Sequence, residues 1–148
     1  MNEAEVALLR KWIGREERKS EHLSAALVER FEATLGDKAA RIDGEAPLAI
    51  HWCLTQPAVA PDGLGPDGHP ARGGFLPPVP LPRRMWAGGE LGFVAPLRAG
   101  EDVTRVSRIA DVVHKQGRSG ELVFVTVAHE ISCAGTLAVT ERQDIVYR

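Results

Sequence analysis

The chain has 148 residues, 44% of them hydrophobic and 26% charged, a length that suits one domain with a substantial buried core. A formal net charge of −2 and an isoelectric point near 6.2 give no support to nucleic-acid binding, which usually requires a basic surface. No apolar run approaches the roughly 18 residues of a membrane-spanning helix, and the N-terminus lacks the apolar core of a signal peptide. Because the two cysteines, Cys53 and Cys133, form no disulfide or zinc pattern, we expect a cytoplasmic protein without a metal site.

The N-terminal segment predicts a short helix followed by a connector. Residues 3–13 place three apolar side chains on one side of a helix that Gly14 closes; they are Val6, Leu9 and Ile13. The charged run at residues 15–19, REERK, is interpreted as a solvated connector.

An amphipathic helix is predicted next. Ser20 is a good N-cap, Glu21 suits the positive end of the helix dipole, and Gly36 ends the pattern. The apolar residues recur every four positions, at Leu23, Leu27, Phe31 and Leu35. This spacing is typical of a helix with one buried face.

The rest of the chain predicts extended structure. Residues 48–54, LAIHWCL, form a short apolar run bounded by turn residues and are interpreted as a strand. Four longer segments follow, joined by Gly-containing turns of hairpin length: residues 84–95, 102–114, 121–132 and 136–147. One long helix before a meander of antiparallel strands predicts an α+β fold, with the helix covering one face of the sheet.

A long Gly- and Pro-rich arm, residues 63–89, separates the first predicted strand from the meander. It is too rich in these residues for a regular helix or strand, yet it carries Phe75, Leu76, Met85 and Trp86. Ordering a loop costs about 1–2 kcal/mol per residue in backbone entropy, so a long ordered loop is usually functional. We expect the arm to pack on the sheet and to line a ligand site; the alternative is that it only plugs one end of the sheet.

Several motifs have a structural interpretation beside a functional one. Residues 63–68 match GxGxxG, but no helix can begin at Gly68-His69-Pro70, so a dinucleotide site is rejected. His51 and Cys53 alternate along the predicted strand and could hold a metal, but without a second ligand pair they are interpreted as core. Cys133 is interpreted as a structural thiol.

Two pairs in the arm are candidates for chemistry. Asp67 and His69 could act as a general base and acid, or Asp67 could cap backbone amides of a turn while His69 faces water. Arg83 and Arg84 could clamp a phosphate or carboxylate, or be surface charges. Both alternatives stay open for each pair.

The block LGPDGHPARGGFLPPVPLPRRMWAGG, followed by PLRAG, KQGRSGELVFV and ERQDIVYR, resembles one family. It is similar to the N-terminal half of the type 2 hydroxyacyl-thioester dehydratases and the mesaconyl-CoA-type hydratases, roughly from Trp12 to Arg148. The FLPP and LPRRMWAGG segments are the most specific part. The resemblance implies one hot-dog domain over residues 1–148, an antiparallel sheet wrapped around a helix.

The resemblance also implies a reaction, the reversible addition of water to the double bond of an enoyl thioester, carried by CoA or acyl-carrier protein and needing no cofactor. Relatives with the MaoC-like pattern hold the catalytic Asp and His in a GDxNPxH loop. At the corresponding place, residues 36–41, this chain keeps Asp37 but lacks the Asn, Pro and His. The sequence therefore departs from the catalytic pattern.

By this resemblance the chain is a half-enzyme that shapes the substrate channel. It would pair with a catalytic hot-dog chain or with itself. Channel and entrance residues would come from the arm: Gly73, Gly74, Phe75, Leu76, Pro77, Pro78, Arg83, Arg84 and Trp86. Two alternatives stay open, a non-enzymatic acyl-thioester-binding or scaffold subunit and a self-sufficient enzyme using Asp67 and His69.

Overall fold

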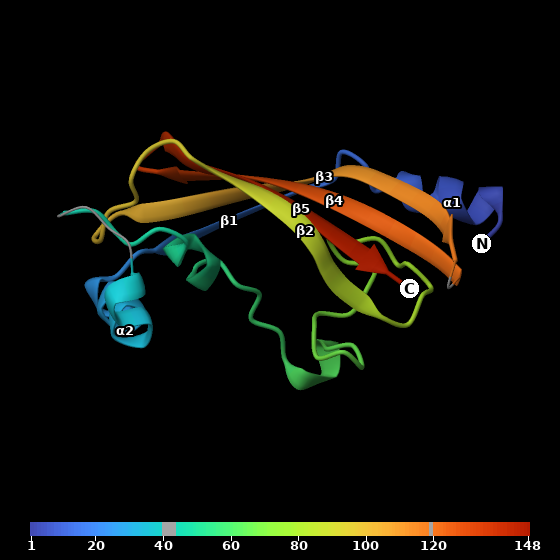
Figure 1. Cartoon of the computed structure of the whole chain (residues 1–148), viewed down its shortest axis with the longest axis horizontal. Helices are drawn as coiled ribbons and strands as arrows, with labels where there is room; N and C mark the ends of the chain where they lie inside the picture. The colour runs from blue at the N-terminus through green and yellow to red at the C-terminus, as the bar shows by residue number, and fades with distance from the viewer. Residues whose placement is uncertain (40–43, 119) are drawn as a thin grey trace.

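The computed structural model describes residues 1–39, 44–118 and 120–148. The elements are α1 (Glu3–Arg10), β1 (Glu16–His22), α2 (Ala25–Leu35), three 3-10 helices (Gly36–Lys38, Ile50–Cys53 and Pro61–Gly63), β2 (Arg84–Phe93), β3 (Asp102–Gly117), β4 (Gly120–Cys133) and β5 (Thr136–Tyr147). The strands form one antiparallel sheet in the order β1-β3-β4-β5-β2, with α2 below one end and the arm below the other (Figure 1). The predicted α+β fold is confirmed. No helix in the described part of the chain is long and apolar enough to cross a membrane.

The start of the chain differs from the prediction. The run interpreted as a connector lies mostly in β1, an edge strand that pairs with β3 from Glu16↔Arg108 to His22↔Asp102. Charged side chains suit an edge because they discourage pairing with other molecules. Ser20 is therefore inside a strand, where its hydroxyl hydrogen-bonds that of Thr104 at 2.8 Å, and does not cap a helix.

Helix α2 begins four residues later than predicted. Ser24 is its N-cap, accepting a hydrogen bond from the Leu27 amide at 3.2 Å, and Gly36 ends it with φ of 56°. Leu23 precedes the helix but is fully buried, because its amide bonds the Glu101 carbonyl and holds it against the sheet. The apolar spacing thus predicted the buried face of the helix but not its first turn.

The segment predicted as a strand at residues 48–54 is instead a 3-10 helix, Ile50–Cys53. Ala49 has φ of 67°, which turns the chain before the helix. Ile50 and Leu54 are both fully buried and four residues apart, a spacing that fits a helical turn. His51 is buried and Cys53 is exposed, so the two do not share one face of a strand.

The inner face of the sheet, the face covered by α2 and the arm, carries two apolar clusters. One packs under α2 and joins Leu23 and Val28 to Val103, Ile131 and Val139 of the strands. The other lies under α1 and the arm, with Leu9, Val79, Ile109, Val125 and Tyr147 among its members. The middle of the inner face lies between these two clusters.

Candidate functional site

A groove of about 660 Å³ lies over the middle of the inner face. One wall is formed by Trp52 and the residues that follow it, and the opposite wall by the arm and the start of β2. The floor is formed by residues of β1, β3, β4 and β5. A concave site of this volume, with apolar walls and a few polar groups, is the usual form of a small-molecule site.

Five polar side chains cross the groove floor as one band, the polar stripe: Arg105, Ser107, His129, Glu141 and Gln143. The strand register aligns three of them, because Ser107 pairs with His129 and His129 pairs with Glu141. Arg105 and Gln143 share this face because each is two residues along its strand from an aligned member. The polar stripe therefore fills the interval between the two apolar clusters.

The polar stripe is hydrogen-bonded across strands. The Nδ1 of His129 lies 2.8 Å from the Ser107 hydroxyl, and its Nε2 lies 3.4 Å from the Gln143 side-chain oxygen. Glu141 accepts a hydrogen bond from the Trp52 indole at 3.1 Å, and its other oxygen lies 3.6 Å from the Nε2 of His51. The 3-10 helix Ile50–Cys53 thus positions two side chains against the carboxylate of Glu141.

The surroundings set the protonation of these groups. Burial lowers the pKa of His129, and the nearby Glu141 carboxylate offsets only part of this effect. Burial alone would raise the pKa of Glu141, but the nearby His51 imidazole and the hydrogen bond from Trp52 help to outweigh it, so the pKa is lowered. Burial also lowers the pKa of Arg105, while the carboxylates of Glu17 and Glu141 oppose the change. At neutral pH the floor therefore carries a neutral imidazole beside an ionised carboxylate and a guanidinium.

This arrangement predicts acid sensitivity. The unfolded chain binds a proton at His129 near its ordinary pKa of 6.5, above the folded value, so the free energy of unfolding should fall as pH drops below about 6.5. Glu141 should add a loss as pH falls below its ordinary 4.5 towards its lowered pKa. Chemical denaturation of His129→Gln should show a flatter profile between roughly pH 5 and 7. His69→Gln is the control, because that side chain is mostly in solvent, and an equally flat profile there would contradict the assignment.

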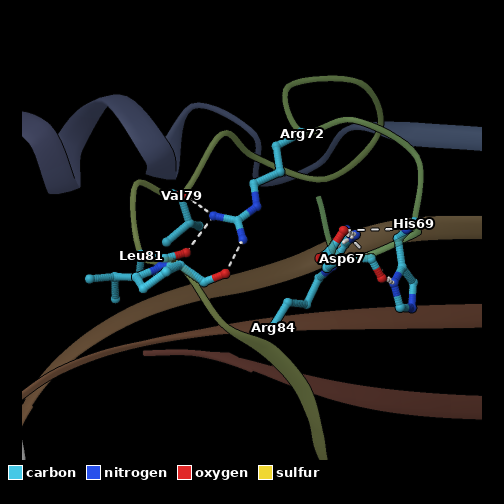
Figure 2. A network of polar contacts seen from close by, with 7 residues as sticks. Asp67, His69, Arg72, Val79, Leu81 and Arg84 are labelled. Atoms are coloured by element: carbon cyan, nitrogen blue, oxygen red, sulfur yellow. Dashed lines mark hydrogen bonds and ion pairs between the residues drawn. The ribbon is translucent and has the colours of Figure 1, made fainter. Parts of the chain in front are cut away.

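Asp67, His69 and Arg84 meet at the rim of the groove (Figure 2). The Arg84 guanidinium donates to both carboxylate oxygens of Asp67, at 3.1 and 3.2 Å, and Asp67 also accepts from the His69 amide at 3.3 Å. The His69 ring is 64% exposed, and its Nδ1 lies 3.0 Å from the Asp67 carbonyl oxygen and 3.9 Å from the carboxylate. Partial burial would raise the pKa of Asp67, but the His69 amide and Arg84 outweigh it, and the pKa is lowered.

The structure brings some of the predicted arm residues to the groove and not others. Those that line it are His69, Gly74, Phe75, Leu76, Arg84 and Trp86. Those that do not are Asp67, Gly73, Pro77, Pro78 and Arg83. Arg83 is exposed, and its backbone pairs with that of Arg148.

Neither cysteine lies in the groove, and the described residues hold no cluster of three His, Cys, Asp or Glu side chains that could bind a metal ion. The Cys133 thiol is buried and donates to the Glu101 carboxylate at 2.9 Å, and burial raises its pKa. A thiol held protonated in this way is a poor nucleophile.

The sequence of residues 48–148 matches the family described as hydroxyacyl-thioester dehydratase type 2. The chain belongs to this family. It is also 42% identical, over 139 residues, to the mesaconyl-C(4)-CoA hydratase of Chloroflexus aurantiacus, covering 93% of this chain and 50% of that protein. The chain thus spans about half the length of this curated relative.

Solved structures show that this family member has a hot-dog fold. The ChsH1–ChsH2 complex from Mycobacterium tuberculosis contains a chain that matches with a TM-score of 0.66 at 15% identity, covering 96% of this chain and 88% of that one. The (R)-hydratase from A. caviae involved in PHA biosynthesis matches with a TM-score of 0.52 at 20% identity over 91% and 95% of the two chains. A hot-dog-like protein from Thermanaerovibrio acidaminovorans matches with a TM-score of 0.52 at 18% identity over 90% and 82%. The predicted hot-dog fold is confirmed.

The described residues of the segment that corresponds to the family's catalytic loop, Gly36 to Ala39, do not border the groove. Gly36–Lys38 forms a 3-10 helix, and the exposed Asp37 carboxylate lies 3.3 Å from the Lys38 ammonium. Ala40 and Arg41, the last residues of that segment, lie outside the described residues.

The polar stripe was not predicted from the sequence motifs. The signal was present, because each long strand alternates apolar residues and interrupts them with polar ones, as in Val103, Arg105, Ser107 and Ile109. Short turns fix the register of β3, β4 and β5, so the interruptions line up. Every second residue of a strand faces the same side, so the polar residues at these positions must lie on the same face as the buried apolar residues on either side of them.

Proposed function

We propose that this chain is the substrate-shaping half of an acyl-thioester hydratase or dehydratase. The reaction is the reversible addition of water to an enoyl thioester of CoA or acyl-carrier protein, with mesaconyl-CoA or a 3-hydroxyacyl thioester as candidate substrates. The observation that carries the proposal is the open groove across the inner face, whose apolar walls suit an acyl chain. Membership of the dehydratase family and the likeness to a mesaconyl-C(4)-CoA hydratase support this substrate class.

The chemistry of the arm supports a non-catalytic role for this half. A general base must accept a proton from the substrate, but Arg84 and the His69 amide occupy the Asp67 carboxylate and lower its pKa. The related hydratase is about twice as long as the matched region, which leaves room for a second hot-dog unit. In this proposal residues 1–148 form one hot-dog domain, and a partner hot-dog chain supplies the catalytic Asp and His in the cytoplasm.

The free edge of β2 is the proposed contact with that partner. Met85 and Trp86 are 45% and 64% exposed, and Phe93 and Val94 are 44% and 63% exposed. Large apolar side chains on an edge strand favour pairing with another sheet. Because Trp86 also lines the groove, a partner on this edge would reach the bound thioester.

Hydration of crotonyl-CoA and mesaconyl-CoA, followed as loss of enoyl absorbance, tests the proposal. We expect no turnover by the purified chain and turnover once a hot-dog chain with a GDxNPxH loop is added. Turnover by the chain alone that is lost in both Asp67→Asn and His69→Ala would contradict the proposal and place the chemistry at the groove rim. No turnover and no rescue would favour the alternative, a non-enzymatic thioester-binding or scaffold subunit.

A further inference from the structure

We propose that Arg105 binds a carboxylate at the far end of the acyl group, and that this residue makes the groove favour mesaconyl-CoA, itself the thioester of a dicarboxylic acid, over a 3-hydroxyacyl thioester without a second carboxylate. This inference rests on the proposed function, because it assigns a substrate class to the same groove. Arg105 is a cation on the groove floor, and most of its hydrogen-bond donors have no partner among the described residues.

Arg105 is half-buried in the middle of β3 and lines the groove. Its only hydrogen bond to a described residue is donated from Nη2 to the Thr55 carbonyl at 2.9 Å, and its Nε is buried without a partner. A guanidinium has five N–H donors in a planar fork, and burying such a charge without partners is unfavourable. The side chain is thus set up to accept an anionic partner.

The nearest carboxylates do not supply that partner. Glu17 lies 3.2 Å from the Lys19 ammonium, and Glu141 is held by Trp52 and His51. No carboxylate of the described residues lies within ion-pairing distance of Arg105. Glu17 and Glu141 help to keep Arg105 charged, but neither forms a hydrogen bond or an ion pair with its guanidinium.

The apolar parts of the groove indicate what carries the carboxylate. Phe75, Val127 and Ile145 offer surface for a hydrocarbon segment, and Arg105 stands with the polar stripe beyond it. An aliphatic tail laid over Arg105 would cover a charged group without bonding it, whereas a carboxylate can accept two parallel N–H bonds from the fork. The groove therefore discriminates against a plain hydrocarbon end.

Equilibrium binding to the full chain by calorimetry tests this. The probes are matched pairs that differ in one terminal group, succinyl-CoA against butyryl-CoA and glutaryl-CoA against pentanoyl-CoA, with free CoA as a third arm. We expect at least one dicarboxylic thioester to bind about tenfold or more tighter than its partner, a difference typical of a charge-assisted bidentate pair. Arg105→Gln should abolish this difference in affinity while leaving the affinity for the monocarboxylic thioester unchanged. Arg105→Lys should retain part of the difference.

Arg108→Gln is the matched control, because Arg108 is an exposed cation of the same strand, β3, and does not line the groove. It should leave the ratio of affinities unchanged. Equal binding of both members of each pair, or a ratio that survives Arg105→Gln, would overturn the inference while the proposed function stands. Equal weakening of free CoA and all thioesters by Arg105→Gln would assign Arg105 to a carrier phosphate and also overturn it. If no thioester binds, the proposed function fails together with the inference.

Discussion

Gly89→Ala is expected to destabilise the chain by about 1–3 kcal/mol, because the new methyl group collides with the backbone of the neighbouring strand. A Cβ at Gly89 would lie 2.5 Å from the Arg142 carbonyl oxygen and 3.4 Å from the Trp86 indole nitrogen. The carbonyl cannot withdraw without breaking the pairing of β2 with β5, where Gly89 faces Gln143. The free energy of unfolding from urea denaturation measures the loss.

The adjacent glycine provides the control. A Cβ at Gly88 would meet no atom within 4 Å, so Gly88→Ala should change the free energy of unfolding by less than about 0.5 kcal/mol. Amide hydrogen exchange should show faster exchange along β2 in Gly89→Ala only. Because β2 contributes Arg84 and Trp86 to the groove, thioester affinity should fall in the same variant. Equal stability of the two variants would show that β2 does not hold this register.

Much of the fold followed from local patterns. The long strands of the meander were predicted because their alternation and Gly-containing turns are encoded within short stretches of sequence; β3 continues to Gly117 beyond the predicted His114. Strand β1 was missed because its seven residues, EERKSEH, have no apolar alternation, and the residues of β3 with which it pairs lie 80 or more positions away in the chain. An edge strand of this kind is fixed by hydrogen bonds to its neighbour and not by its own side chains.

The site was predicted only where it lies in the arm. Composition alone indicated that the arm packs on the sheet, and Phe75, Leu76, Arg84 and Trp86 do line the groove. Arg105 was not predicted to belong to the site, because a single arginine in a strand has no distinguishing pattern. Only the strand register shows which face of the sheet it occupies. That information is non-local, since it depends on the pairing of β3 with β4 and of β4 with β5.

Arg72 is the residue that we expect to hold the arm in place. Its guanidinium donates to three backbone carbonyls of the arm: from Nη1 to Val79 at 2.7 Å and to Leu81, and from Nη2 to Pro82 at 2.9 Å (Figure 2). It also lies 5.4 Å from the centre of the Tyr147 ring. Pro77, Pro78, Pro80 and Pro82 remove backbone N–H donors from this stretch, so its chain cannot form a regular ladder and its carbonyls need a side-chain donor.

Arg72→Met, which keeps the apolar stem and removes all five donors, should therefore cost about 1.5–3 kcal/mol of unfolding free energy, the usual range for a hydrogen bond to a charged group. The loss should be local first, with the arm cut faster in limited proteolysis and thioester binding weakened, because Phe75 and Leu76 form part of the groove wall. Arg83→Met is the matched control, since that side chain is exposed and makes no hydrogen bond or ion pair with the described residues. Similar proteolysis of the two variants would mean that Val79, Leu76 and the other apolar contacts of the arm suffice to hold it, and that the carbonyls freed by the substitution are satisfied by water.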